Sequence, residues 1–346
     1  MSQNNPFSLS FGKKPQSTIN RATNESEIID NFQSENPAYQ VCMITGVRGS
    51  GKTVSMTTIA NRFKNRDNWI VVDLNPEVDM IHALAVELSN HSMLIQIFKD
   101  AKINLSFLGL GVELKGTPPI TDISVALDRM LEHLTKINKK ILVTIDEVSN
   151  NKSVRTFTSQ FQIYMRKNYS VFLIMTGLYG RIFELQNDKT HTFLYRAPKL
   201  ELKPLNLGLI AESYKRYLGV TNDEANEMAK LTLGYPFAYQ VLGYLCFEKK
   251  MSYTDVIPEF DFYLEELVYE KIWSEISTKD KSVLRGMCNT ENTKVEAIRS
   301  AIDMDSNNFT VYRKRLLKKG LIRDIEYGHL TFALPRFKEF IQRQIF

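Results

Sequence analysis

Three glycines, a lysine and a threonine occur together in the segment GVRGSGKT, residues 46–53. Glycines let the backbone turn so that several N–H groups face one anion. Lys52 offers a positive charge to the β- and γ-phosphates of a nucleotide, and the Thr53 hydroxyl is a ligand for Mg²⁺. The spacing G-x-x-x-x-G-K-[ST] therefore predicts a loop that binds the phosphates of ATP. Its candidate nucleotide-binding residues are Gly46, Val47, Arg48, Gly49, Ser50, Gly51, Lys52, Thr53 and Val54.

A loop of this kind depends on the elements on either side of it. The apolar run YQVCMITG, residues 39–46, predicts a buried strand that leads into the loop. The stretch TVSMTTIANRFKN, residues 53–65, predicts a helix whose N-terminus brings the positive end of its dipole to the phosphates. The required order of strand, loop and helix is therefore present.

Two adjacent carboxylates end another apolar run, KKILVTIDEV, residues 139–148. This run predicts a buried strand that delivers Asp146 to the carboxyl end of a sheet, where ligands of open α/β sheets bind. We expect Asp146 to hold Mg²⁺ through its water shell, and Glu147 to orient or activate the attacking water. An acidic pair alone can simply end a strand, but together with the glycine loop it indicates nucleotide hydrolysis.

Two further groups are candidates for action at the γ-phosphate. The strand YSVFLIMTG, residues 169–177, would place the Thr176 hydroxyl beside the γ-phosphate if it adjoins the strand that carries Asp146. Arg196, which precedes a short strand-like run, is the leading candidate for an arginine finger, and Arg181 is the second. The competing interpretations are an ordinary strand end for Thr176 and simple surface positions for the two arginines.

The apolar runs alternate with amphipathic stretches up to about residue 206. Continuous Val, Ile and Leu runs separated by helices predict a parallel sheet covered on both faces, so we expect an α/β fold. The segment KINLSFLGLGVELKG, residues 102–116, interrupts this rhythm and predicts a β-hairpin that turns near Gly109. Residues 207–272 are mainly helical in pattern, and residues 1–20 form a polar leader that we expect to be loosely held.

The C-terminal segment carries the positive excess of the chain. From Ser277 onwards there are 14 Lys and Arg against 8 Asp and Glu, compared with 44 against 39 in the whole chain. Helices are predicted at 277–289, 294–304 and 305–320, and a hairpin around Tyr327-Gly328 follows them. Helix, helix, basic helix and hairpin is the order of a winged helix-turn-helix.

The third of these helices is the candidate DNA-binding element. We expect Asp305 or Ser306 as its N-cap and Gly320 as its end. Its predicted buried stripe consists of Phe309, Tyr312, Leu316 and Leu317. Its predicted outward face consists of Asn308, Val311, Lys314, Arg315 and Lys318, and all of these except Val311 are candidates for contact with duplex DNA. The alternative is a solvated basic face on a module that packs or contacts proteins.

Together these motifs resemble the AAA+/STAND group of P-loop ATPases, and within it the archaeal-type and origin-recognition initiator ATPases. The resemblance also includes the run LELKPL after Arg196 and the Gly234-Tyr235-Pro236 motif. It implies an ATPase core with a helical lid and a C-terminal winged helix, with Pro236 at the nucleotide and the segment 15–21 on the adenine. The implied ranges are 1–36 for the leader and adenine-side segment, 37–206 for the core, 207–272 for the lid and 273–346 for the winged helix.

The sequence therefore predicts a Mg²⁺-dependent ATPase that acts as a nucleotide-dependent switch on DNA or on a DNA-bound complex. An arginine finger would require a homo-oligomer or a contribution from the lid. The alternative is a nucleotide-gated signalling or recruitment scaffold with little hydrolysis and no DNA contact. The long helical region disfavours a small-molecule kinase.

The apolar runs are too short to span a bilayer, and the N-terminus is unlike a secretory signal. Both features predict a cytoplasmic protein. Its three separated cysteines, Cys42, Cys246 and Cys288, are expected to be buried hydrophobes.

Overall fold

The computed structural model describes residues 4–10, 12, 15–106, 116–188, 192–290 and 293–344. The contacts within the chain divide it into two compact units. The sheet unit comprises Ala22–Thr45 and Ser55–Glu201. The C-terminal unit comprises Met1–Arg21, Gly46–Val54 and Leu202–Phe346. The glycine loop therefore belongs to the same unit as the C-terminal helices, although a strand of the sheet unit leads into it.

The sheet unit contains five parallel strands in the order β2-β3-β4-β1-β5. The strands are β1 (Val41–Thr45), β2 (Trp69–Leu74), β3 (Lys140–Ile145), β4 (Val171–Gly177) and β5 (Lys199–Glu201). Every residue of β1 and β4 is buried, as the continuous apolar runs predicted. Strand β4 lies between β1 and β3, so the strand that ends at the acidic pair is not the immediate neighbour of the strand that leads into the glycine loop.

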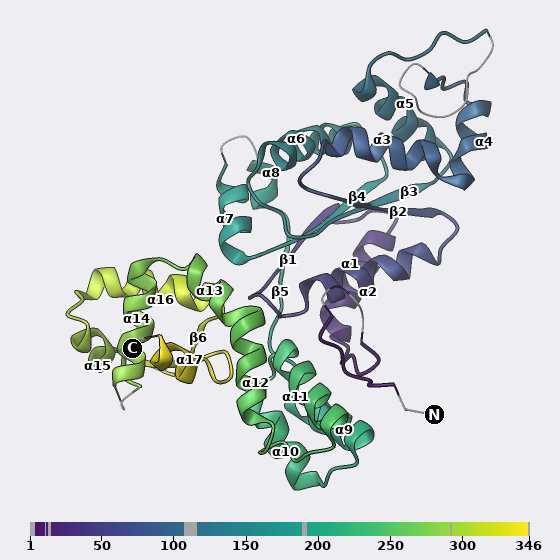
Figure 1. Cartoon of the computed structure of the whole chain (residues 1–346). Helices are drawn as coiled ribbons and strands as arrows, with labels where there is room; N and C mark the ends of the chain where they lie inside the picture. Colours follow the sequence, from purple (N-terminus) through teal and green to yellow (C-terminus); the bar gives the residue numbers. More distant parts are fainter. Residues whose placement is uncertain are drawn as a thin grey trace. The chain divides into compact units, whose positions relative to one another are not determined.

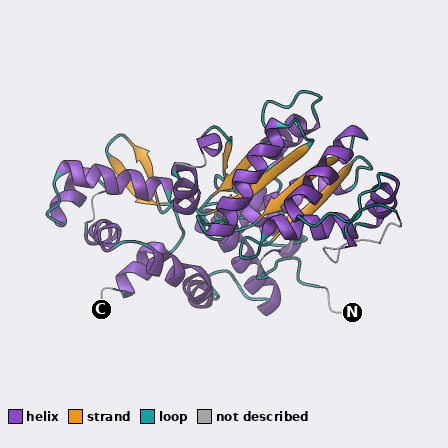
Figure 2. Ribbon diagram, turned by 90° about the horizontal axis from the view of Figure 1, so that it is seen from above, coloured by secondary structure: helices purple, strands orange, loops and turns teal. Residues whose placement is uncertain are grey.

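Helices cover both faces of this sheet, which confirms the predicted α/β architecture (Figure 1). On one face α3, α5 and α6 pack on the aliphatic side chains of the strands. On the other face aromatic rings join α1 and α2 to the sheet, with Phe32 4.9 Å from Phe172 and Phe63 4.2 Å from Trp69 between ring centroids. The helices are α1 (Ala22–Gln33), α2 (Lys52–Lys64), α3 (Met80–Asn90), α4 (Ser92–Asp100), α5 (Ile123–Lys136), α6 (Lys152–Arg166), α7 (Tyr179–Asn187) and α8 (Thr192–Tyr195). Figure 2 shows the strands of the sheet side by side in orange.

The predicted hairpin at residues 102–116 falls largely outside the described residues. Residues 102–106 form a turn and a loop without a strand. Residues 107–115, including the predicted turn at Gly109, lie outside the part of the chain that the structure describes.

The lid of the C-terminal unit is helical, as the sequence predicted. Its helices are α9 (Leu207–Leu218), α10 (Asn222–Leu231), α11 (Pro236–Lys249), α12 (Ile257–Leu264), the π-helix η2 (Glu265–Tyr269) and α13 (Glu270–Glu275). The expectation of a loosely held leader is wrong for its described residues. Phe7 is buried against Tyr214 and Tyr239, and the Tyr239 hydroxyl donates to the Ser17 carbonyl at 2.7 Å. One aromatic side chain in a polar segment is enough to anchor it, because burial of a phenylalanine contributes about 1.5–3 kcal/mol.

The last segment contains the three helices and the hairpin that the sequence predicted. The elements are α14 (Thr278–Asn289), α15 (Val295–Ala301), α16 (Ser306–Lys318), β6 (Ile322–Glu326), β7 (His329–Phe332) and α17 (Phe337–Arg343). Asp305 is the N-cap of α16 and accepts from the amides of Asn307 and Asn308. Strands β6 and β7 are antiparallel, and Gly328 in the turn between them has a φ of +78°. These elements form the predicted winged-helix order.

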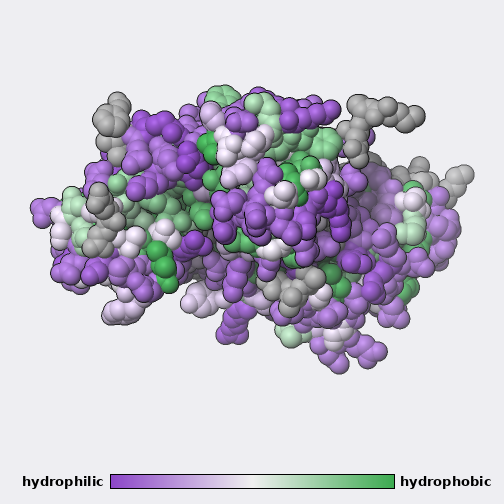
Figure 3. Space-filling model, turned by 90° about the horizontal axis from the view of Figure 1, so that it is seen from below, coloured by the Kyte–Doolittle hydropathy of each residue, from purple (hydrophilic) through white to green (hydrophobic). Residues whose placement is uncertain are grey.

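The three cysteines are buried, as expected. Burial raises the pKa of Cys42 to about 12 and that of Cys288 to about 11, so these thiols stay protonated at neutral pH. Within the described residues, no helix is both long and apolar enough to cross a membrane. The face drawn in Figure 3 is mainly hydrophilic, with apolar side chains in scattered groups.

Candidate nucleotide site

At two positions the glycine loop has a backbone conformation that strongly favours glycine. Gly49 and Gly51 have φ values of +75° and +87°, in the left-handed region that side chains disfavour. A Cβ atom on Gly49 would lie 2.2 Å from the Tyr235 hydroxyl, and one on Gly46 would lie 2.4 Å from Ser50 Oγ. The backbone conformation therefore favours glycine at positions 49 and 51, and a side chain at position 46 would require Ser50 to move.

The side chains of the loop fit the phosphates of a nucleotide. Lys52 Nζ donates to the carbonyls of Gly46 at 3.2 Å and Val47 at 3.1 Å, which holds the ammonium within the curve of the loop. Ser50 is only 3% exposed, and its hydroxyl has no hydrogen-bond partner among the described residues. A buried hydroxyl without a partner is costly unless a ligand satisfies it. Helix α2 begins at Lys52, so its N-terminus also faces the loop.

Two residues outside the loop, Arg21 and Tyr235, hold its carbonyl groups. Arg21 donates to the Ser50 carbonyl at 2.9 Å and to the Lys203 carbonyl at 2.8 Å. The Tyr235 hydroxyl donates to the Arg48 carbonyl at 2.5 Å, and burial raises the pKa of Tyr235, so it remains a donor. Sequence reasoning missed this role of Tyr235, although it is the middle residue of the motif that ends in Pro236. Pro236 itself is the first residue of α11 and is half-buried.

The acidic pair lies at the carboxyl end of β3, as predicted, and it contacts Thr176 at the end of β4. The Thr176 hydroxyl donates to Asp146 Oδ1 and accepts from the Glu147 amide at 3.2 Å. Glu147 has a φ of +52°, which is unusual for a residue with a side chain and typical of functional sites. Strand β4 does adjoin β3, but Thr176 is fully buried and its hydroxyl orients the acidic pair. The contact of Thr176 with the γ-phosphate stays a prediction.

The two arginine-finger candidates lie in the segment between β4 and β5. Arg196 is exposed just after α8, and Arg181 lies in α7. The two predicted metal ligands belong to different units, because Thr53 is in the C-terminal unit with the loop and Asp146 is in the sheet unit.

Three of the four α16 residues predicted to contact DNA lie on its exposed surface, and their contact with DNA stays a prediction. Asn308, Lys314 and Lys318 are exposed, whereas Phe309 and Leu316 are buried. The predicted outward direction of Arg315 is wrong. Its guanidinium donates to the buried carboxylate of Asp280 on α14, at 2.9 Å from Nε and 2.6 Å from Nη2.

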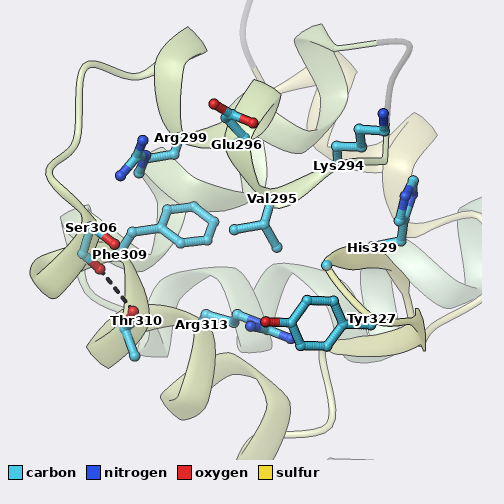
Figure 4. Close-up of a pocket in the computed structure, with 11 residues that line it drawn as sticks. Lys294, Val295, Glu296, Arg299, Ser306, Phe309, Thr310, Arg313, Tyr327 and His329 are labelled. Carbon is cyan, nitrogen blue, oxygen red and sulfur yellow. Dashed lines mark hydrogen bonds between the residues drawn. The ribbon is translucent and has the colours of Figure 1, made fainter.

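A separate pocket of about 380 Å³ lies between α15, the start of α16 and the hairpin turn (Figure 4). Val295 and Phe309 form its apolar floor, and Arg299, Arg313 and Tyr327 lie around it. The pocket lies on a different side of α16 from Lys314 and Lys318. Neither of these lysines lines it.

A domain of unknown function, DUF8462, matches residues 266–341. No curated protein matches the sequence. Among solved structures, a Walker-type ATPase of Pyrococcus abyssi, PABY2304, is similar with a TM-score of 0.70 and 17% identity over 97% of this chain and 99% of that one.

The ORC2 protein of Aeropyrum pernix is similar in two forms. Its ADPNP–ADP complexes give a TM-score of 0.61 with 12% identity, and its ADP form gives 0.50 with 14% identity. Both alignments cover 97% of this chain and 96% of that one. The chain therefore shares the α/β P-loop fold of these ATPases, as the sequence motifs predicted.

Proposed function

We propose that this chain binds ATP with Mg²⁺ at the glycine loop, hydrolyses it, and works as a nucleotide-dependent switch on DNA or on a DNA-bound complex. The observation that supports ATP binding most directly is the loop itself, with Lys52 held inside it and the buried Ser50 hydroxyl left for a ligand. The similar ORC2 structures were solved with ADPNP and ADP, which agrees with this proposal.

The residues have distinct roles in this proposal. The loop amides and Lys52 bind the phosphates, and Pro236 and the segment 15–21 contact the nucleoside. Thr53 and Asp146 would hold Mg²⁺, which neutralises charge on the phosphates when bound. Glu147 directs the attacking water, and Thr176 keeps Asp146 and Glu147 in place. Arg196, which is exposed, is the proposed arginine finger for a neighbouring subunit.

Replacement of Lys52 tests the binding step. Loss of a charged hydrogen bond to phosphate costs about 1.5–3 kcal/mol, so Lys52→Ala should weaken ATP binding by about 10- to 100-fold. Calorimetric titration with ATP and Mg²⁺ measures this directly. Lys64→Ala is the control, because Lys64 lies at the other end of α2 and pairs with Asp73 at 3.4 Å. Equal affinity of Lys52→Ala and wild type would contradict the assignment.

The DNA role is tested on the exposed face of α16. The charge reversals Lys314→Glu plus Lys318→Glu should weaken duplex binding at least about tenfold. They should also lower the salt slope, which is the steepness with which the logarithm of the binding constant falls with the logarithm of the salt concentration, by about two. Binding is measured by fluorescence anisotropy over a range of salt concentrations. Lys215→Glu plus Lys230→Glu makes the same charge change on exposed lid residues and serves as the control. A salt slope that is unchanged in the α16 variant would remove this face from the DNA contact.

A specific observation also favours the alternative, a nucleotide-gated scaffold. Arg315 is engaged with Asp280, and Val311, on the same face as Lys314 and Lys318, is 60% exposed. The engagement of Arg315 leaves one cation fewer on this face for a DNA phosphate. ATP binding without any salt-dependent duplex binding would support the scaffold.

A further inference from the structure

Residue Arg48 links the glycine loop to the helix that precedes the winged helix. Its guanidinium Nη2 lies 3.5 Å from Glu275 Oε1, and both side chains are partly buried. Glu275 is the last residue of α13, only a short step before α14 begins at Thr278. Lys271 also contacts Glu275 at 3.4 Å, which fixes the carboxylate on its helix.

The main chain of Arg48 is held at the same time by the lid. The Tyr235 hydroxyl donates to the Arg48 carbonyl at 2.5 Å. In a trans peptide the N–H points away from the C=O, so this bond directs the Gly49 amide to the side opposite Tyr235. In the same way, Arg21 on the Ser50 carbonyl directs the Gly51 amide. The carbonyl partners therefore set the directions of the amides that would bind phosphate.

The residue before Arg48 contacts the winged helix directly. Val47 packs on the apolar cluster of the C-terminal unit. It lies at the turn that ends α16, because a Cβ atom on Gly320 would be 3.6 Å from Val47 Cβ. Two successive residues of the loop thus contact α13 and the end of α16.

We infer that Arg48 and Glu275 are positioning residues that hold the glycine loop in its phosphate-binding shape and couple nucleotide binding to the winged-helix segment. This inference rests on the proposed ATP binding. The ion pair fixes the Arg48 side chain while Tyr235 fixes its carbonyl, so loss of either contact lets the loop amides reorient. Coupling between two sites is reciprocal, so ATP must also change the stability of the segment that carries Glu275.

A purely electrostatic effect of Glu275 would change the affinity for ATP in the opposite direction to the loss of a positioning residue. Glu275 is a negative charge near the loop, and its removal without any positioning effect would strengthen the binding of phosphates. If Glu275 positions Arg48, its removal weakens that binding. The direction of the change in affinity therefore distinguishes the two explanations.

The experiment compares wild type, Glu275→Gln, Arg48→Gln and the double variant in the full chain. Glu275→Gln should raise the Kd and KM for ATP by about five- to tenfold, with a smaller change in kcat. The double variant should bind no more weakly than Arg48→Gln, because the two residues act through one contact. Glu270→Gln, an exposed residue on the same helix, is the control and should bind like wild type.

Hydrogen exchange provides the second readout. An ATP analogue should slow amide exchange in α13, α14 and α16 of the wild type, and this protection should be lost in Glu275→Gln at saturating analogue. Tighter or unchanged ATP binding by Glu275→Gln, or intact protection in that variant, would overturn the inference while leaving ATP binding in place. A wild type that binds no ATP would overturn the proposed function and this inference with it.

Discussion

Replacing Glu147 with glutamine should lower ATP turnover by about 10²- to 10⁴-fold while ATP still binds. Glutamine keeps the size and the hydrogen-bonding reach of the side chain but cannot accept a proton from water. The backbone of Glu147 should stay in place, because its amide donates to Thr176 Oγ1 at 3.2 Å and to Asp146 Oδ1 at 3.1 Å. The loss should therefore fall on the chemical step and leave the affinity for ATP intact.

Phosphate release in steady state measures the turnover, and calorimetry on the same samples measures ATP binding. Glu184→Gln is the matched control, since Glu184 is an exposed glutamate of α7 in the same unit. It should hydrolyse ATP at the wild-type rate. A Glu147→Gln variant with full turnover would show that another group directs the water.

The positions of the glycine loop and of the acidic pair in the fold could be predicted from local sequence patterns. The glycine loop is recognisable because its backbone conformation at Gly49 and Gly51 strongly favours glycine. The acidic pair was predictable because β3 is a continuous apolar run that must end at Asp146. The helices after Ser277 were predictable from caps such as Asp305, which the structure confirms.

The parts that depend on distant contacts were not predictable from local patterns. Phe7 sits in a polar leader, and only the folded lid shows that it fills a space beside Gly243. Tyr235 is recognisable as part of a motif, but its bond to Arg48, far away in the chain, is not. Glu275 looks like a surface glutamate at the end of a helix, because nothing in its neighbours in sequence indicates an arginine partner.

The orientation of Arg315 also depends on a residue that is distant in the sequence. The helical pattern placed it with Lys314 and Lys318, since charged residues on a helix normally face water. Asp280, however, is 0% exposed, and it pairs with both Arg315 and Lys319. A buried carboxylate needs compensating charges, so α14 dictates the direction of the Arg315 side chain on α16.

Asp280→Asn should destabilise the winged-helix segment by about 2–3 kcal/mol. The loss of one partner from a fully buried ion pair costs about 3–5 kcal/mol. We expect a smaller cost here because water partly screens Arg315 and Lys319, whose side chains are 38% and 25% exposed. Asp280 also accepts from the Ser277 amide in the capping box of α14, which asparagine can do less well. Hydrogen exchange of α14 and α16 measures the free energy of local unfolding.

Asp255→Asn, at an exposed position of the same unit, is the control and should change stability by less than about 0.5 kcal/mol.

Arg315→Gln then separates a structural role from a DNA contact. If Arg315 serves Asp280, Arg315→Gln lowers stability as Asp280→Asn does, and the salt slope of any duplex binding by the folded variant stays unchanged. If Arg315 contacts phosphate, Arg315→Gln lowers that slope by about one, as a phosphate-contacting lysine would, and stability is preserved. The structure predicts the loss of stability. Arg315 donates two hydrogen bonds to the buried carboxylate of Asp280, and this carboxylate would lose a partner if Arg315 turned towards DNA.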